Sequence, residues 1–237
     1  MLAFSIDIDW APEEVIIDTL SLFEKYGVKC TIFSTHNSYA VIKSNRKLFE
    51  VAIHPNFNPF LTGTDKQVDD VIDELIELHP DAKGVRSHSL MQSTGINQRF
   101  ADKGLVYDSN LLLPYHHGLK PFKSWNGMVR IPYNWEDDVH WTYGYSFDDC
   151  RMNLADDGLV VFDLHPIHIF LNTDNKYRYK EAKKHYNDPD KLISLRNTEI
   201  KGTRDLLISL LRYISENKIE NKTLLEIANA FIYGGKV

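Results

Sequence analysis

The stretch LAFSIDID, residues 2–9, begins the chain with an apolar run that predicts a buried β-strand ending in two aspartates. Side chains two residues apart on a strand point to the same side, so we expect Asp7 and Asp9 to emerge together at its end. Two carboxylates this close favour a bound metal ion or a shared proton. The structural alternative is a polar strand end that leads into a helix.

Beyond this strand, predicted helices and strands alternate. Apolar stripes at helical spacing run through residues 13–26, which Gly27 ends, and through residues 68–78. Short helices are expected at 38–49 and 98–103, and two further helices at 206–217 and 223–231. Strands are expected at 29–35, 51–54, 85–89, 106–109, 128–132 and 159–165. This alternation is typical of a parallel sheet covered by helices, either an open doubly wound sheet or a (β/α) barrel. Irregular strand spacing and the scarcity of helix between residues 110 and 157 favour a distorted α/β barrel.

The chain of 237 residues is long enough for one large domain, and we expect a single domain over residues 1–237. Residues 172–200 are polar and predict a loop or insertion before the C-terminal helices. No basic patch accompanies the net charge of −6, so nucleic acid is not an expected partner. No apolar run reaches the length of a membrane span and no signal peptide precedes the first strand, so we expect a cytoplasmic protein.

Polar side chains gather where four of the predicted strands end. Asp9 ends the first, and His54, residues 86–89 (RSHS) and His165 end three others. The carboxyl ends of parallel strands meet on one face, where α/β proteins build their sites. Imidazole and carboxylate together suit a divalent metal such as zinc, which makes Asp9 and His54 the first two candidate ligands. The third candidate is Asn58 or His88.

Arg86 and His88 share the parity of one predicted strand, so both are expected to face the same way. If that way is inward, Arg86 lies among carboxylates and holds Asp7 ionised through a charge-assisted hydrogen bond. His165 stands at the end of the last strand, and the proline after it favours an extended backbone there.

In this order, the clusters resemble the motifs of the polysaccharide deacetylase family, also called the NodB-homology family or carbohydrate esterase family 4. The resemblance covers residues from 4 to about 168 and implies a distorted (β/α)7 barrel with one divalent metal ion. By family position, Asp7 is the expected base and His165 the expected acid. Asp9 and His54 are expected metal ligands, and Arg86 is the expected partner of the base.

The chain departs from the family pattern at several motifs. Ile8 separates two aspartates that are adjacent in typical members, and Asn58 stands where a second metal-binding histidine is expected. The usual proline and aromatic residue after Arg86 are missing, and the last motif reads Asp163-Leu164-His165. Asn58 and His88 therefore remain alternative third ligands. The whole pattern is similar to a divergent, WbmS-like branch associated with bacterial surface-polysaccharide loci.

The resemblance implies a metal-dependent hydrolase that removes an acyl group, N-acetyl in the first instance, from a sugar or a sugar-linked precursor. Asp7 would take a proton from water and His165 would protonate the leaving amine, with His168 as the competitor for that role. An inactive barrel that still binds sugar is an alternative, because the second histidine is missing. A phosphatase of the Asp-x-Asp type is disfavoured, because its chemistry has no use for His54 or His165.

Overall fold

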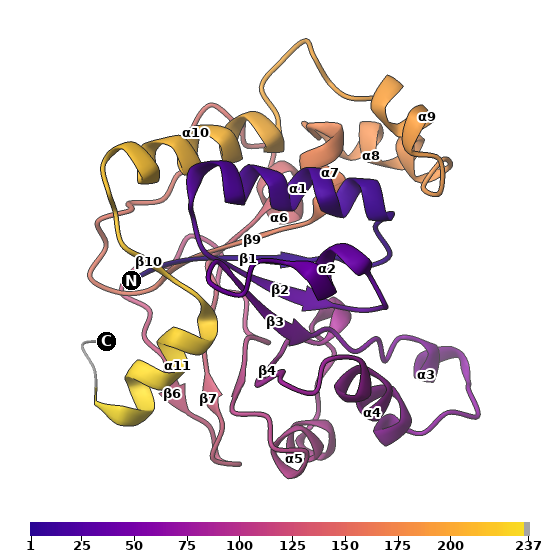
Figure 1. Ribbon diagram of the computed structural model, residues 1–237, viewed down its shortest axis with the longest axis vertical. Coiled ribbons are helices and arrows are strands. Elements are labelled where there is room, and N and C mark those ends of the chain that lie inside the picture. The colour runs from indigo at the N-terminus through magenta and orange to yellow at the C-terminus, as the bar shows by residue number, and fades with distance from the viewer. Residues whose placement is uncertain (235–237) are drawn as a thin grey trace.

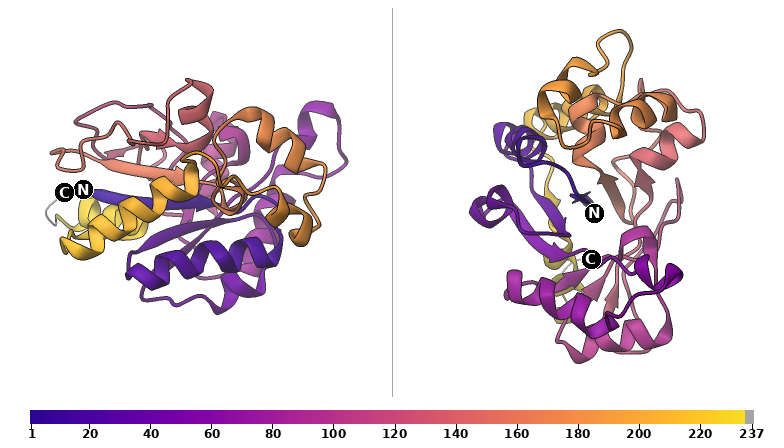
Figure 2. Two further views of the ribbon diagram at one scale, coloured as in Figure 1. Left: turned by 90° about the horizontal axis from the view of Figure 1, so that it is seen from above. Right: turned by 90° about the vertical axis from the view of Figure 1, so that its right-hand side faces the viewer.

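The computed structural model describes residues 1–234, and its strands join into one curled sheet (Figures 1 and 2). The strands are β1 (Leu2–Asp7), β2 (Cys30–Ser34), β3 (Phe49–Ile53), β4 (Gly84–Val85), β5 (Tyr107–Asp108), β6 (Phe122–Lys123), β7 (Val129–Arg130), β8 (Trp135–Glu136), β9 (Val160–Leu164) and β10 (Asn221–Lys222). Their order is β6-β7-β5-β4-β3-β2-β1-β9-β8, with β10 paired to β1. All neighbours on this path run parallel except β6 and β7. Within the described residues β6 and β8 end the path, so the barrel is open between them.

Helices surround this sheet. They are α1 (Glu13–Tyr26), α2 (Tyr39–Lys43), α3 (Pro59–Thr62), α4 (Val68–Leu78), α5 (Thr94–Asp102), α6 (Asp137–Thr142), α7 (Pro166–Leu171), α8 (Lys176–Lys183), α9 (Pro189–Ser194), α10 (Thr203–Glu216) and α11 (Leu224–Tyr233), with a 3-10 turn, η1, at His88–Leu90. α1, α7 and α10 pack together on the side of β1 and β9 (Figure 1). No helix of the described chain is long and apolar enough to cross a membrane.

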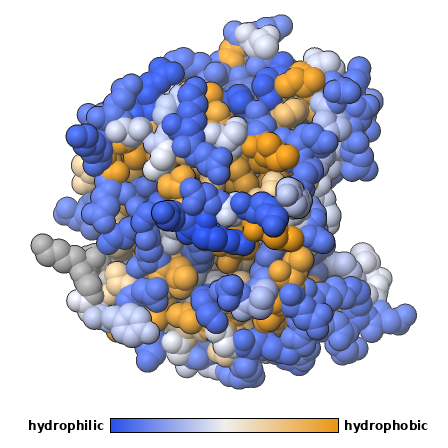
Figure 3. All heavy atoms as spheres, viewed as in Figure 1, coloured by the Kyte–Doolittle hydropathy of each residue, from blue (hydrophilic) through white to orange (hydrophobic). Residues whose placement is uncertain are grey.

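Successive side chains of β1 point alternately outward, to the core between sheet and helices, and inward, to the interior of the barrel. Phe4 and Ile6 point outward into the cluster that α1, α7 and α10 complete. Ala3 points inward, where it packs with the first turns of α11 at the amino end of the barrel. Ser5 and Asp7 follow on the same inward side and are also buried. The barrel therefore becomes polar toward the carboxyl ends of its strands. On the face seen in Figure 3, hydrophilic side chains predominate and apolar ones show in separate groups.

A half-buried carboxylate joins α11 to the barrel. Glu50 accepts hydrogen bonds from the Thr31 hydroxyl and the Leu225 backbone N–H, both at 2.8 Å, and from the Tyr107 hydroxyl. Burial raises the pKa of Glu50. The Tyr107 ring lies directly over Gly84, where a Cβ would overlap its ring atoms. β4 therefore requires glycine at this position.

The predicted helices at 13–26 and 68–78 are confirmed with those boundaries. The helix expected at 38–49 is wrong in length, because α2 ends at Lys43 and Phe49 already begins β3. The strand expected at 85–89 is also wrong, because β4 ends at Val85. The segment 172–200 was expected as a loop or insertion, and the loop alternative is wrong because the segment contains α8 and α9. The predicted distorted barrel is confirmed.

Candidate active site

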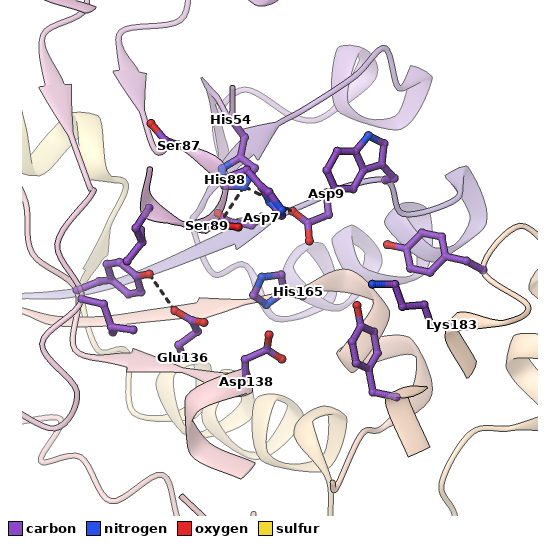
Figure 4. A pocket seen from close by; sticks show the side chains of 16 residues that line it. Asp7, Asp9, His54, Ser87, His88, Ser89, Glu136, Asp138, His165 and Lys183 are labelled. Carbon is purple, nitrogen blue, oxygen red and sulfur yellow. Dashed lines mark hydrogen bonds and ion pairs between the residues drawn. The ribbon is translucent and has the colours of Figure 1, made fainter. Parts of the chain in front are cut away.

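A cavity of about 580 Å³ lies at the carboxyl ends of the parallel strands (Figure 4). It is lined by side chains that end or follow β1, β3, β4, β8 and β9, among them Asp7, Asp9, His54, His88, Glu136 and His165. The structure thus brings most of the residues singled out from the sequence to one place.

Asp9, His54 and His88 form a compact donor set. Asp9 Oδ1 lies 3.5 Å from His54 Nε2 and 3.1 Å from His88 Nδ1. Tetrahedral zinc with bonds of about 2.1 Å holds its ligand atoms about 3.4 Å apart, so the spacing suits a divalent ion. Both ring nitrogens of His54 are buried without a hydrogen-bond partner, which leaves a lone pair available for a metal. Burial alone would raise the pKa of Asp9, but the nearby imidazoles of His54 and His88 outweigh it and lower this pKa strongly.

Two other groups of acids and histidines in the described chain could hold a metal. In one, Asp7 and Asp163 are both bound by Arg86, whose charge opposes a cation. In the other, the pairs His165–Asp137 and His168–Asp138 include Asp137 and His168, which lie outside the cavity lining of the described chain. The group of Asp9, His54 and His88 therefore has the best claim to a metal ion.

Asp7 and Asp9 both reach the cavity as predicted, but the predicted reason, alternation along one strand, is wrong. β1 ends at Asp7, and Asp9 has a φ of 44°, in the left-handed region. Aspartate tolerates that region better than most residues. The Asp9 carbonyl oxygen is held by the Thr35 hydroxyl and lies 2.9 Å from His36 Nδ1. A turn, rather than strand alternation, brings the Asp9 carboxylate to the histidines.

The parity argument for Arg86 and His88 is wrong for the same kind of reason, because both residues lie beyond the end of β4. His88 begins the η1 turn, whose Ser89 and Leu90 have φ values of 55° and 53°. Asn58 instead donates a hydrogen bond to Ser89 Oγ at 3.1 Å and lies outside the lining of the cavity in the described chain. The structure therefore brings His88, and not Asn58, to Asp9.

Arg86 is fully buried inside the barrel, against the carboxylates of β1 and β9. Its Nη1 donates to Asp7 Oδ1 at 2.9 Å and also to Asp163 Oδ1. The rings of Phe33 and Tyr133 cover its guanidinium from 4.3 and 4.2 Å. Burial raises the pKa of Asp163, against the opposing effect of the Arg86 charge. The expected contact between Arg86 and Asp7 is present, and Asp163 is a second partner that sequence reasoning missed.

His165 enters the cavity from the end of β9 beside β1. Its Nδ1 lies 2.8 Å from Asp137 Oδ1, and its backbone N–H donates to Asp137 Oδ2. Burial by itself lowers the pKa of His165, but the charge and hydrogen bond of Asp137 outweigh it and raise this pKa well above its ordinary value. His168 is buried outside the cavity lining of the described chain, with Nε2 2.6 Å from Asp138 Oδ1. The geometry favours His165 over His168 as the group that faces a ligand.

Several cavity residues were missed from the sequence. Glu136 and Asp138 come from β8 and the first turn of α6, and Tyr179, Lys183 and Tyr186 come from the segment 172–200. The Glu136 carboxylate accepts a hydrogen bond from the Tyr133 hydroxyl at 2.8 Å. Burial raises the pKa of Glu136 to about 7. The acidic run at 136–138 was the available signal, since it interrupts an aromatic-rich stretch.

A family model described as WbmS-like polysaccharide deacetylase matches residues 4–183. The chain belongs to this family. A Bordetella bronchiseptica protein assigned as a polysaccharide deacetylase involved in O-antigen biosynthesis has a crystal structure with 41% sequence identity, 90% coverage of each chain and a TM-score of 0.83. The resemblance inferred from the motifs is thereby confirmed, and membership argues against the phosphatase alternative.

More distant polysaccharide deacetylases share the fold. The peptidoglycan N-acetylglucosamine deacetylase Bc1960 has 14% identity and a TM-score of 0.53, over 95% of this chain and 86% of that one. The peptidoglycan deacetylase PdaC of Bacillus subtilis has 13% identity and a TM-score of 0.53, over 99% and 92%. A search of curated proteins found no match.

Proposed function

We propose that the chain is a metal-dependent deacetylase that removes an acyl group, N-acetyl in the first instance, from a sugar or sugar-linked precursor in surface-polysaccharide metabolism. The observation that carries the proposal is the arrangement of two ion pairs and one three-residue donor set around one cavity. Asp7 with Arg86 and His165 with Asp137 flank the donor set of Asp9, His54 and His88. The Bordetella relative, assigned to O-antigen biosynthesis, supports the choice of pathway.

Asp9, His54 and His88 would hold the metal, which we propose to be zinc. A divalent ion bound there supplies Lewis acidity toward the acyl carbonyl and lowers the pKa of the attacking water. Two neutral imidazoles and one carboxylate form the kind of ligand set that catalytic zinc sites use.

Asp7 is the proposed general base. Its Oδ1 is bound by Arg86, while its Oδ2 lies 3.5 Å from His54 Nε2, on the side of the donor set. The buried guanidinium fixes the carboxylate in one orientation. Oδ2 is therefore the atom that accepts the proton from water.

His165 is the proposed general acid. Asp137 occupies its Nδ1, so Nε2 is the nitrogen left to donate a proton to the leaving amine. The pKa of His165 is raised, chiefly by Asp137, which favours the protonated imidazole that this role requires. An amide needs such a donor, since an unprotonated amine is a poor leaving group.

The test replaces the proton acceptor without changing its shape. Asp7→Asn should lower acetate release from N-acetylated sugars by about 10²- to 10⁴-fold, while zinc content stays unchanged. Asn58→Ala is the matched control and should keep both activity and zinc. Turnover retained in Asp7→Asn would contradict the role of Asp7. Sugar binding without acetate release by the zinc-loaded wild-type protein would instead support the inactive sugar-binding barrel.

A further inference from the structure

We infer that the cavity takes a sugar bearing a negatively charged group, a carboxylate or a phosphate, and that Lys183 binds this group. The inference rests on the proposed function, because it concerns the substrate of the same cavity. It assigns a specificity role to the segment 172–200, which supplies none of the proposed catalytic residues.

Lys183 ends α8 and lines the cavity with Tyr179 and Tyr186 of the same segment. Figure 4 shows its ammonium end directed into the cavity, toward Asp9 and His165. Its Nζ lies 5.7 Å from the centroid of the Tyr179 ring. The aromatic ring therefore supports the side chain from one side and favours a cation at this position.

The ammonium group of Lys183 has no carboxylate partner within residues 1–234, although acidic side chains share its cavity. Asp7 is bound by Arg86, and Asp9 lies against His54 and His88.

The two remaining acids of the cavity are engaged as well. Asp138 pairs with His168 at 2.6 Å, and Glu136 is bound by the Tyr133 hydroxyl. The charge of Lys183 is thus left available for a ligand, and in the described lining it is the one lysine or arginine.

The charges of the cavity favour an anionic group of the ligand beside Lys183 and oppose it beside the acidic residues. Near Asp138 and Asp9, a carboxylate or phosphate would meet like charge. Beside Lys183 it gains a charge-assisted hydrogen bond. A sugar whose acyl group lies between Asp7 and His165 could therefore be oriented by an anion that extends toward α8.

The same helix provides a matched control. Lys184, the next residue, is exposed as Lys183 is, but it pairs with Glu181 at 2.8 Å and lies outside the cavity lining of the described chain. Loss of Lys184 removes an equal charge from the protein without touching the cavity. Any effect confined to Lys183 is then local and does not reflect the net charge.

The experiment measures binding by calorimetry, with zinc-loaded wild type, Lys183→Ala and Lys184→Ala. The probes are N-acetylglucosamine, its 6-carboxylate N-acetylglucosaminuronic acid, and N-acetylglucosamine 1-phosphate. At least one anionic sugar should bind the wild type about three- to tenfold more tightly than the neutral one, less so at high salt. This preference should disappear in Lys183→Ala and persist in Lys184→Ala. The better of the two anions identifies whether the group is on C6 or at the reducing end.

Equal affinity for all three sugars in the wild type, or absence of measurable binding of both anions, would overturn the inference. So would a preference that survives Lys183→Ala. Acetate release is followed in the same samples, which separates the two proposals. A Lys183-dependent preference without acetate release supports the specificity role and contradicts the proposed hydrolysis. Acetate release without the preference supports hydrolysis and contradicts the specificity role.

Discussion

Asp7 and Asp9 are two residues apart and occupy different electrostatic surroundings. Asp7 continues the inward side of β1 and has a permanent cationic partner in Arg86. Asp9 leaves the strand through a left-handed turn and faces two imidazoles. A base must release and take up protons, whereas a metal ligand must stay ionised, and the strong lowering of the Asp9 pKa suits the second task.

The donor set predicts which variants lose metal. His54→Ala and His88→Ala should each weaken zinc binding by at least about 100-fold, because each removes a direct ligand. Asn58→Ala should leave zinc affinity unchanged, since the Asn58 amide is directed to Ser89. Competition titration with a zinc-binding dye measures all three. Loss of zinc in Asn58→Ala alone would place the third ligand at the family position instead.

The proposed acid predicts a dependence on the leaving group. His165→Ala should slow hydrolysis of an N-acetyl sugar by about 10²- to 10⁴-fold and affect an activated aryl acetate much less, because a phenolate leaves unaided. His168→Ala should act equally on both substrates, through packing. Steady-state rates on the two substrates decide, and equal losses in His165→Ala would argue for a structural role.

Glu136 predicts a pH-dependent term in stability. Because burial raises its pKa from 4.5 to about 7, the folded protein holds this proton more tightly than the unfolded chain does. The stabilisation that comes from burying the protonated Glu136 carboxyl is complete below pH 4.5 and is lost as pH rises to about 7. In metal-free protein, Glu136→Gln should therefore gain on the order of 2 kcal/mol relative to wild type across this window. Urea unfolding at several pH values measures the difference, which would stay constant if Glu136 titrated normally.

Among the secondary-structure elements, those with a strong periodic pattern were predictable. α1 and α4 have apolar stripes long enough to define both ends. α8 has no such stripe, and it is stabilised by the Asn175 cap and by the pairs Asp174–Arg178 and Glu181–Lys184. Polar composition of that kind is shared by loops, so the segment was expected to be one.

The cavity residues also divide into those that the sequence pattern could reveal and those that it could not. His54 and His165 follow strands of five residues and were found from that position. Asp137 and Asp138 follow β8, whose two residues are too few to show alternation. The turn that presents His88 depends on left-handed Ser89 and Leu90, residue types for which no sequence rule predicts that conformation.

Two glycines in different surroundings should respond differently to substitution by alanine. Gly84 of β4 lies against Tyr107 of β5, whereas Gly95 has space around it. Gly84→Ala should destabilise the protein by about 1–3 kcal/mol, because a Cβ would overlap the Tyr107 ring. Gly95→Ala, in α5, meets its nearest atom at 3.6 Å and should be neutral or stabilising by up to about 1 kcal/mol. Thermal unfolding of both variants tests the pair. A harmless Gly84→Ala would mean that Tyr107 can move aside.

Across the whole molecule, the proposed site joins two distant parts of the chain. Asp7 to His88 come from its first four strands, and Asp137 to Tyr186 come from the later half. That these belong to one domain over residues 1–237 stays a prediction, as does the choice of zinc.

Because the site is formed only in the folded chain, zinc should stabilise the whole molecule. At about 100 times the dissociation constant, the gain in unfolding free energy should be about 2.7 kcal/mol, and a chelator should reverse it. Asp9→Ala should show no such gain. Calorimetric melting with and without zinc measures it, and an equal gain in Asp9→Ala would assign the stabilising ion to another place.

The position of β1 also affects how the chain folds as it is synthesised. β1 pairs on one side with β2, which follows within thirty-odd residues, and on the other with β9, which begins only at Val160. At ribosomal rates of about 5–20 residues per second, roughly 6 to 26 seconds separate the completion of these two edges. During that time the apolar strand LAFSID has an open hydrogen-bonding edge, which is prone to pair with other chains. Slower growth at low temperature or added chaperone should therefore raise the yield of native protein.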